Sequence, residues 1–169
     1  MHPLARKIVD VPDFPQPGIL FRDITPLLRS HFTKTIDAVE ALWSAAEWAA
    51  TDAVAGVESR GFILAAALAE RRSKGFVPIR KKGKLPPPVV DREYVLEYGS
   101  GVLEMQRGAG RLLVVDDVLA TGGTLAASAQ LAVDAGFEVE TVGVLIDLGL
   151  APEFRWRGAP VRTVIRYGG

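Results

Sequence analysis

Two adjacent carboxylates, Asp116 and Asp117, stand between an apolar run and a short turn in this sequence. The run Leu112–Val115 is typical of a buried parallel strand, and the residues Leu125–Ala135 after the turn are typical of a helix. Backbone N–H groups at the positive end of a helix dipole bind phosphate well. The acids, one step away, can accept hydrogen bonds from ribose hydroxyls. This arrangement suits a sugar phosphate.

The turn that follows the acids supplies the donors for such a phosphate. It consists of Ala120, Thr121, Gly122, Gly123 and Thr124. The two threonines add hydroxyl groups, and the glycines let the backbone approach a ligand without a Cβ clash. The simpler interpretation is a structural turn in which Asp117 or Thr121 only caps the helix. The full string favours phosphate binding.

Composition restricts the class of protein. The 169 residues form one expected domain with 20 basic and 20 acidic residues, so no overall charge attracts nucleic acid or a membrane surface. The absence of cysteine fits a reducing compartment. No amino-terminal signal segment is evident, and the apolar stretch Phe62–Ala69 is too short to cross a bilayer. We expect a cytoplasmic protein without a nucleic-acid or membrane partner.

Alternating strands and helices predict an α/β fold. Right-handed crossovers between such strands give a mainly parallel sheet, whose ligands bind beyond the carboxyl ends of the strands. The expected strands are Ala53–Val57, Phe76–Ile79, Leu112–Val115, Val139–Ile146 and Val161–Arg166, with an antiparallel pair Tyr94–Glu97 and Val102–Met105; the expected helices are Pro3–Val9, Phe32–Ala50 capped by Ser30, Gly61–Arg72 and Leu125–Ala135.

Two polar segments follow expected strands. Glu58-Ser59-Arg60-Gly61 comes after the strand that ends at Val57, and its turn can present N–H groups and Arg60 to an anion. Alone, Arg60 would more often be a surface residue paired with Glu58. The run Arg80–Lys84 would by itself be a solvated charge run, but it opens a long loop, which is typical of a functional lid.

A proline-braced segment, Phe14–Leu27, offers Phe21 and aliphatic side chains to a ligand or to the core, and the residues alone leave both uses open.

The string from Leu112 to Thr124 resembles the phosphoribosyl-pyrophosphate signature of type I phosphoribosyltransferases. Four further segments, in order, resemble the adenine phosphoribosyltransferase family: Phe14–Leu27, Glu58–Gly61, Ile79–Pro86 and Tyr94–Gly99. The resemblance covers residues 11–148. It implies the type I fold, a mainly parallel twisted sheet flanked by helices. A short amino-terminal hood with the base-binding strap (residues 1–30) and a flexible lid loop with a hairpin (residues 81–105) complete that fold.

The resemblance also implies a reaction. Enzymes of this family transfer 5-phosphoribosyl from phosphoribosyl pyrophosphate to adenine, giving AMP and pyrophosphate in purine salvage. Mg²⁺ is the implied cofactor, bound mainly through the substrate and through water to the two acids, and a homodimer is the implied assembly. By position, the resemblance implies that the base binds at Leu20, Phe21 and Arg22, and that the ribose binds at Asp116 and Asp117. The residues implied for the 5′-phosphate are Ala120, Thr121, Gly122, Gly123 and Thr124. The residues implied for the pyrophosphate are Glu58, Ser59, Arg60, Arg80, Lys81 and Lys84.

The implied catalytic residues are Arg60 and Glu97, the latter an acid/base near N7 of adenine, with Tyr98 beside it on the lid. The sequence departs from the family pattern at Pro86–Pro88, which stiffen the lid loop. Two alternatives stay open: a transferase for hypoxanthine, xanthine or orotate, and a regulator that binds the sugar pyrophosphate without catalysis.

Overall fold

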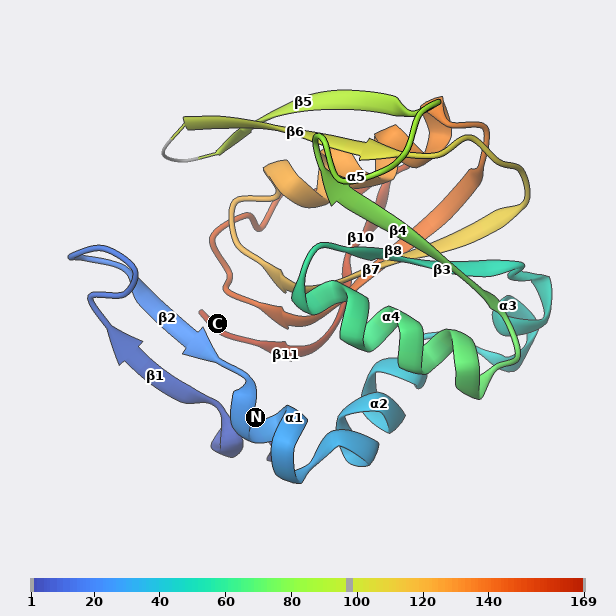
Figure 1. The fold of residues 1–169 in the computed structure, drawn as a ribbon. Helices are drawn as coiled ribbons and strands as arrows, with labels where there is room; N and C mark the ends of the chain where they lie inside the picture. Colours follow the sequence, from blue (N-terminus) through green and yellow to red (C-terminus); the bar gives the residue numbers. More distant parts are fainter. Residues whose placement is uncertain (1, 97–98, 169) are drawn as a thin grey trace.

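A seven-stranded sheet forms the centre of the computed structural model, which describes residues 2–96 and 99–168 (Figure 1). Parallel pairing joins five strands, and β6 and β5 add antiparallel pairing at one edge. The predicted mainly parallel sheet is therefore confirmed. In spatial order the strands are β11 (Arg162–Arg166), β8 (Glu138–Asp147), β7 (Arg111–Leu119), β3 (Ala53–Val57), β4 (Gly75–Lys81), β6 (Gly99–Met105) and β5 (Val90–Leu96).

Helices cover both faces of the sheet because successive strand residues point to opposite sides. On β7, Leu113 and Val115 belong to the core under helices α2 (Phe32–Glu40) and α4 (Arg60–Arg71). Leu112 and Val114 belong to the other core, beneath α5 (Gly123–Asp134). The three layers fix the carboxyl ends of β3, β4 and β7 side by side at one end of the strands.

The amino terminus differs from the expectation. A 3₁₀ helix covers only Pro3–Lys7, and the chain then forms a hairpin of β1 (Val9–Pro12) and β2 (Leu20–Asp23), followed by α1 (Thr25–Ser30). Asp13 Oδ1 accepts a hydrogen bond from Gly18 N at 2.7 Å inside the hairpin loop. This hairpin lies beside the carboxyl terminus in Figure 1.

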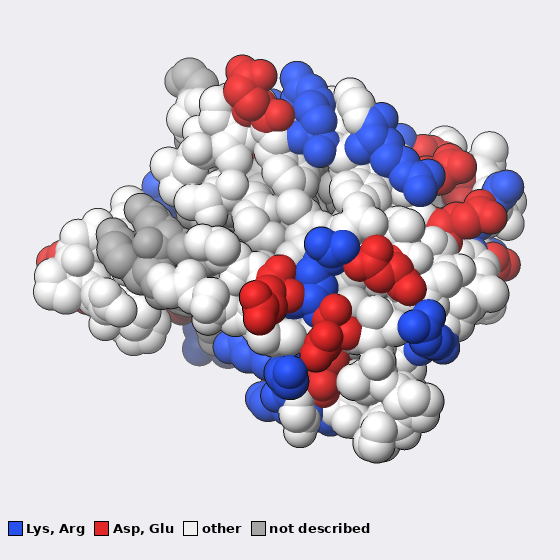
Figure 2. Space-filling view, turned by 90° about the horizontal axis from the view of Figure 1, so that it is seen from above, with Lys and Arg blue, Asp and Glu red and all other residues white. Residues whose placement is uncertain are grey.

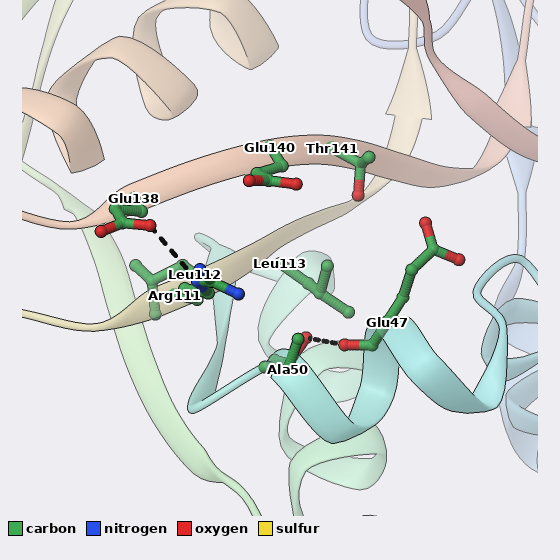
Figure 3. Close-up of a pocket in the computed structure, with 9 residues that line it drawn as sticks. Glu47, Ala50, Arg111, Leu112, Leu113, Glu138, Glu140 and Thr141 are labelled. Carbon is green, nitrogen blue, oxygen red and sulfur yellow. Dashed lines mark hydrogen bonds and ion pairs between the residues drawn. The ribbon is translucent and has the colours of Figure 1, made fainter.

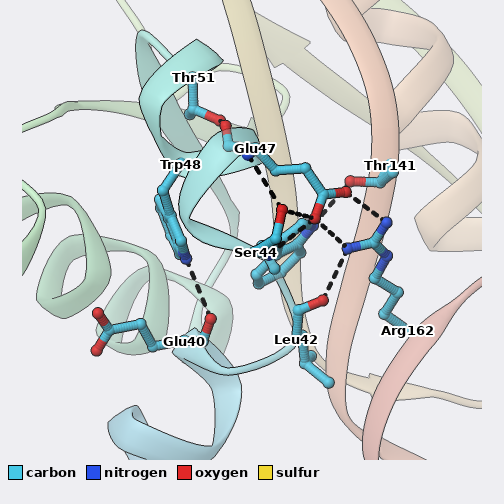
Figure 4. Close-up of polar contacts among 9 residues, drawn as sticks. Glu40, Leu42, Ser44, Glu47, Trp48, Thr51, Thr141 and Arg162 are labelled. Carbon is cyan, nitrogen blue, oxygen red and sulfur yellow. Dashed lines mark hydrogen bonds and ion pairs between the residues drawn. The ribbon is translucent and has the colours of Figure 1, made fainter.

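The predicted helix Phe32–Ala50 is wrong in its length, because it is two helices. α2 ends at Glu40, and α3 (Ala45–Ala50) begins after Ser44, whose side chain and that of Glu47 form a reciprocal capping box. Glu47 Oε1 also accepts a hydrogen bond of 2.5 Å from Nη2 of Arg162, which lies on β11 (Figure 4). Ser30 caps no helix: it ends α1.

The segment that was predicted to form a lid, residues 81–105, contains a loop and a long hairpin. Strands β5 and β6 pair along their full length, more than the predicted pair. Arg92 on β5 donates from Nη2 to Asp134 Oδ2 of α5 at 2.6 Å, which fixes the hairpin on that helix. A third, small hairpin of β9 (Arg155–Trp156) and β10 (Ala159–Pro160) was not predicted.

Acidic and basic side chains intermingle on the face that carries the β5–β6 hairpin (Figure 2). None of the described helices has the length and hydropathy that a membrane crossing requires.

Candidate active site

The turn that was predicted to bind phosphate lies at the carboxyl end of β7. The strand was predicted to end at Val115, but it continues through both acids to Leu119, because Val118 and Leu119 extend its apolar pattern. α5 begins at Gly123, and Gly122 before it has φ of 91°, a conformation that glycine adopts without strain. A cavity of about 140 Å³ is lined by Asp116 and residues 118–125. The turn thus surrounds a space of the size that a phosphate group needs.

Both acids are buried, and Asp116 also lines this cavity. Asp116 and Asp117 are 7% and 5% exposed, and Asp116 Oδ1 accepts the backbone N–H of Asp117 at 2.8 Å. Burial, and then the neighbouring charge of Asp117, raise the pKa of Asp116 well above its ordinary value. Gly61 permits this packing, since a Cβ there would lie 2.8 Å from Asp116 Oδ1.

Arg60 joins three of the predicted segments. Its Nε lies 2.7 Å from Asp117 Oδ2, and its guanidinium carbon lies 4.9 Å from the centre of the Phe21 ring. The ion pair connects the turn after β3 to β7, and the cation–π contact connects both to the hood. A residue predicted to bind the base and one predicted to bind the ribose therefore meet at the same arginine.

Glu58 contacts three basic residues of the segment that follows β4 or ends it, Arg80, Lys81 and Lys84. Its Oε1 lies 2.7 Å from Lys84 Nζ and 3.4 Å from Arg80 Nη2, and its Oε2 accepts the backbone N–H of Lys81 at 2.8 Å. Burial raises the pKa of Glu58, but the hydrogen bonds from Lys84, Lys81 and Arg80 outweigh it and lower the pKa to about 2. The side chain of Ser59 makes no cap hydrogen bond to α4, and the Glu58–Ser59 peptide is cis.

Glu104 supports the site but was not among the site residues predicted from the sequence. Glu104 is 3% exposed, and its Oε1 accepts the backbone N–H groups of Lys84 and Leu85, each at 2.7 Å. Backbone hydrogen bonds, the one from Gly83 first, lower the pKa of Glu104. A lone acid among the apolar residues of β6 is a signal that could have found it.

The hood places Phe21 at the site but turns Arg22 elsewhere. Phe14 packs edge-on to Phe21 with ring centres 5.1 Å apart. The Arg22 guanidinium pairs with Asp10 and lies 4.1 Å from the centre of the Tyr167 ring. The Arg22–Tyr167 contact has no signal in the sequence because nearly the whole chain separates the two residues.

The remaining predicted residues stand apart from these contacts. Leu20 is exposed, and Lys81 donates its backbone N–H to Glu58. Glu97 and Tyr98 lie outside the described residues. A separate cavity of about 70 Å³ lies at the amino-terminal ends of β7 and β8 (Figure 3). Its lining residues include Glu47, Arg111 and Glu138. It is at the opposite edge of the sheet from the predicted site.

Comparison with known proteins agrees with this geometry. Residues 36–161 match the family model of the phosphoribosyl transferase domain. An adenine phosphoribosyltransferase of Hydrogenovibrio crunogenus is 52% identical over 98% of this chain and 97% of its own length, and one of Bdellovibrio bacteriovorus is 46% identical over 97% and 99%. A crystal structure of adenine phosphoribosyltransferase from Rhodothermus marinus superimposes with a TM-score of 0.85 at 43% identity and covers 96% of both chains.

The fold and the site define a phosphoribosyltransferase. This class combines a glycine turn after a strand that ends in two buried acids with basic residues at the ends of the adjacent strands. The chain belongs to the phosphoribosyl transferase family and, within it, to the adenine phosphoribosyltransferases. The fold class and the family predicted from the sequence are confirmed.

Proposed function

We propose that this chain transfers the 5-phosphoribosyl group from phosphoribosyl pyrophosphate to adenine and releases AMP and pyrophosphate. The observation that carries this proposal is the position of Arg60 between Phe21 and Asp117. A base stacked on Phe21 and a ribose held at Asp117 would be joined near this arginine. The structure from Saccharomyces cerevisiae, 35% identical with a TM-score of 0.84, is a complex with adenine and an imino-sugar bisphosphate and covers 95% of this chain and 96% of its own.

The sugar phosphate would be held by β7 and the turn after it. Backbone N–H groups and hydroxyls of residues 120–124 bind the 5′-phosphate at the start of α5. Asp117 accepts hydrogen bonds from the ribose hydroxyls, and Asp116 Oδ1 holds the backbone of Asp117 by accepting its N–H. Arg60 pairs with Asp117 in the free enzyme and so compensates the negative charge of this buried residue.

Displacement at the anomeric carbon gives that carbon oxocarbenium character, as in other glycosyl transfers. The main demand is to stabilise the negative charge that develops on the leaving pyrophosphate. Ser59, Arg60, Arg80, Lys81 and Lys84 lie at the ends of β3 and β4 and would supply that stabilisation. Glu97 would exchange a proton with N7 of adenine, beside Tyr98, and the lid would exclude water, which competes as acceptor.

The base would occupy the space between the hood and the sheet. Phe21 offers one ring face, and β2 pairs with β1 alone among the described strands, so its other edge has backbone groups near Leu20 and Arg22 for the edge of the base. A binding site built on backbone groups discriminates by the donor and acceptor pattern of adenine.

Mg²⁺ fits the donor set in a limited role. The described residues include no cluster of three acidic, histidine or cysteine side chains that could hold a metal, and Asp117 is already paired with Arg60. Mg²⁺ keeps several waters and binds through few carboxylates and substrate oxygens. Asp116 and Asp117 would hold it through water, and it would supply charge neutralisation to the pyrophosphate.

A homodimer in the cytoplasm completes the proposal. Phe62 and Phe76 pack edge-on, and Ile63 and Phe76 are exposed on the outer side of α4 and β4. Such an exposed apolar patch is typical of an interface. Light scattering on the purified chain measures the mass, and a monomer at micromolar concentration contradicts the dimer.

The reaction is tested by AMP formation from adenine and phosphoribosyl pyrophosphate with Mg²⁺, beside guanine, hypoxanthine, xanthine and orotate. We expect turnover of adenine alone. Turnover of another base would contradict the substrate, and binding of the sugar pyrophosphate without any product would favour a regulator.

A further inference from the structure

Glu58 is an anion inside a subsite that is expected to bind an anion. Its carboxylate is 9% exposed and contacts Lys84 Nζ at 2.7 Å, Arg80 Nη2 at 3.4 Å and the backbone N–H of Lys81 at 2.8 Å. These are three of the groups that the proposed function assigns to pyrophosphate. By family position Glu58 was expected to bind substrate, but its carboxylate would repel a pyrophosphate bound to the same cations.

The hold of Glu58 on the two cations is unequal. The Lys84 contact is short, whereas the Arg80 contact is long and Arg80 Nε is buried without a hydrogen-bond partner among the residues described here. Arg80 Nη1 also donates to the Lys84 carbonyl at 3.2 Å. The Arg80 guanidinium thus has donor capacity that a polyanion with several oxygens would satisfy better than one carboxylate.

The Lys84 backbone is fixed independently of Glu58. Glu104 holds the N–H groups of Lys84 and Leu85, so the loop stays in place when the Lys84 ammonium changes partner. The ammonium can move because its side chain is 49% exposed. An exchange of partners therefore requires only side-chain motion.

We propose that Glu58 is a positioning residue that occupies Lys84 and Arg80 in the free enzyme and gives them up when pyrophosphate enters. This inference rests on the proposed function of the site. It has two consequences. The cations are held in place before the substrate binds, and pyrophosphate binds less tightly than to the same cations without Glu58, which favours its release as a product.

The test compares Glu58→Gln with Glu58→Asp, which keeps the charge, and with Glu70→Gln, the same chemical change at an exposed position near the far end of α4. Calorimetry with magnesium pyrophosphate gives Kd, and steady-state kinetics give the KM for phosphoribosyl pyrophosphate and kcat. We expect E58Q to bind pyrophosphate at least about fivefold more tightly than the wild type. Its KM and kcat should both fall, while E70Q should stay near wild type. E58D should bind pyrophosphate less tightly than E58Q, because it keeps the competing negative charge.

A merely structural role would instead raise KM as kcat falls. The inference is overturned if folded E58Q binds pyrophosphate equally or less tightly while the wild type remains active. Glu58→Ala carries the same expectation if E58Q does not fold. A wild type that neither binds pyrophosphate nor forms AMP contradicts the proposed function itself, so the two failures are distinct.

Discussion

Arg60 and Asp117 form a partly buried ion pair of 2.7 Å that connects the turn after β3 to the strand β7. The two residues come from motifs more than fifty positions apart, and their contact is the point at which the separate phosphate and ribose predictions become one site. Removal of either charge should therefore affect substrate binding as well as local packing.

The variant Asp117→Asn removes the charge and keeps the shape. We expect kcat/KM for phosphoribosyl pyrophosphate to fall by roughly 10- to 150-fold, the range of a hydrogen bond to a charged group of about 1.5–3 kcal/mol. Circular dichroism should show an unchanged fold. Asp37→Asn, exposed on α2, is the matched control and should keep full activity. Full activity in the Asp117 variant would remove this residue from the ribose site.

The variant Glu97→Ala tests the acid/base. General acid–base groups contribute roughly 10²- to 10⁴-fold, so kcat should fall by that amount while the KM for adenine changes little. Glu93→Ala on β5, where the side chain is exposed, is the control. A variant in which only KM rises would show that Glu97 binds substrate without taking part in proton transfer.

The variant Gly61→Ala tests the close packing of α4 on β7. The new methyl group would meet Asp116 Oδ1 at 2.8 Å and the Val115 carbonyl oxygen at 3.1 Å. Overpacking of this kind costs about 1–3 kcal/mol of unfolding free energy, which urea titration measures. Gly75→Ala, whose nearest contact is the Ala53 methyl at 3.2 Å, should cost less. Equal stability of the Gly61 variant and the wild type would show that α4 can shift.

Glu47 should make stability depend on acid pH. Hydrogen bonds from Arg162 and then from the Ser44 backbone lower its pKa from 4.5 to about 2 (Figure 4). Because the folded-state pKa is lowered, the stabilisation is complete above pH 4.5 and is lost as the pH falls toward 2. The pair is about one-third exposed, so the contribution is at most about 1 kcal/mol. Urea titrations at pH 6 and pH 3 should show a smaller loss of stability for Glu47→Gln than for the wild type.

The sequence predicts the sheet well because its strands are apolar runs that end in polar residues. Leu112–Val115 before two acids and a glycine turn leaves little freedom in the order of elements. The break in the helix at Ser44 was also readable, since Ser44-Ala45-Ala46-Glu47 is a capping-box pattern that begins a new helix.

Other features could not be predicted because they depend on distant contacts. Strands β1 and β2 have four residues each and gain stability from pairing such as Val11 with Phe21. The pairing of Glu58 with Lys84 depends on the path of the loop after β4, which periodicity does not define. Residue types therefore predict the members of the site, and tertiary packing decides which of them pair.

Helix α5 contacts the β5–β6 hairpin at both of its ends. At the first residue, Gly123, a Cβ would lie 2.6 Å from the Val95 carbonyl oxygen, and at the last residue Asp134 binds Arg92. One inserted or deleted residue within α5 would rotate Asp134 by about 100° around the helix axis relative to Gly123. The two contacts could not then form together. The length of α5 is thereby constrained. Substitutions at its surface can be accommodated, but an insertion or a deletion would separate the turn at residues 120–124 from the β5–β6 hairpin.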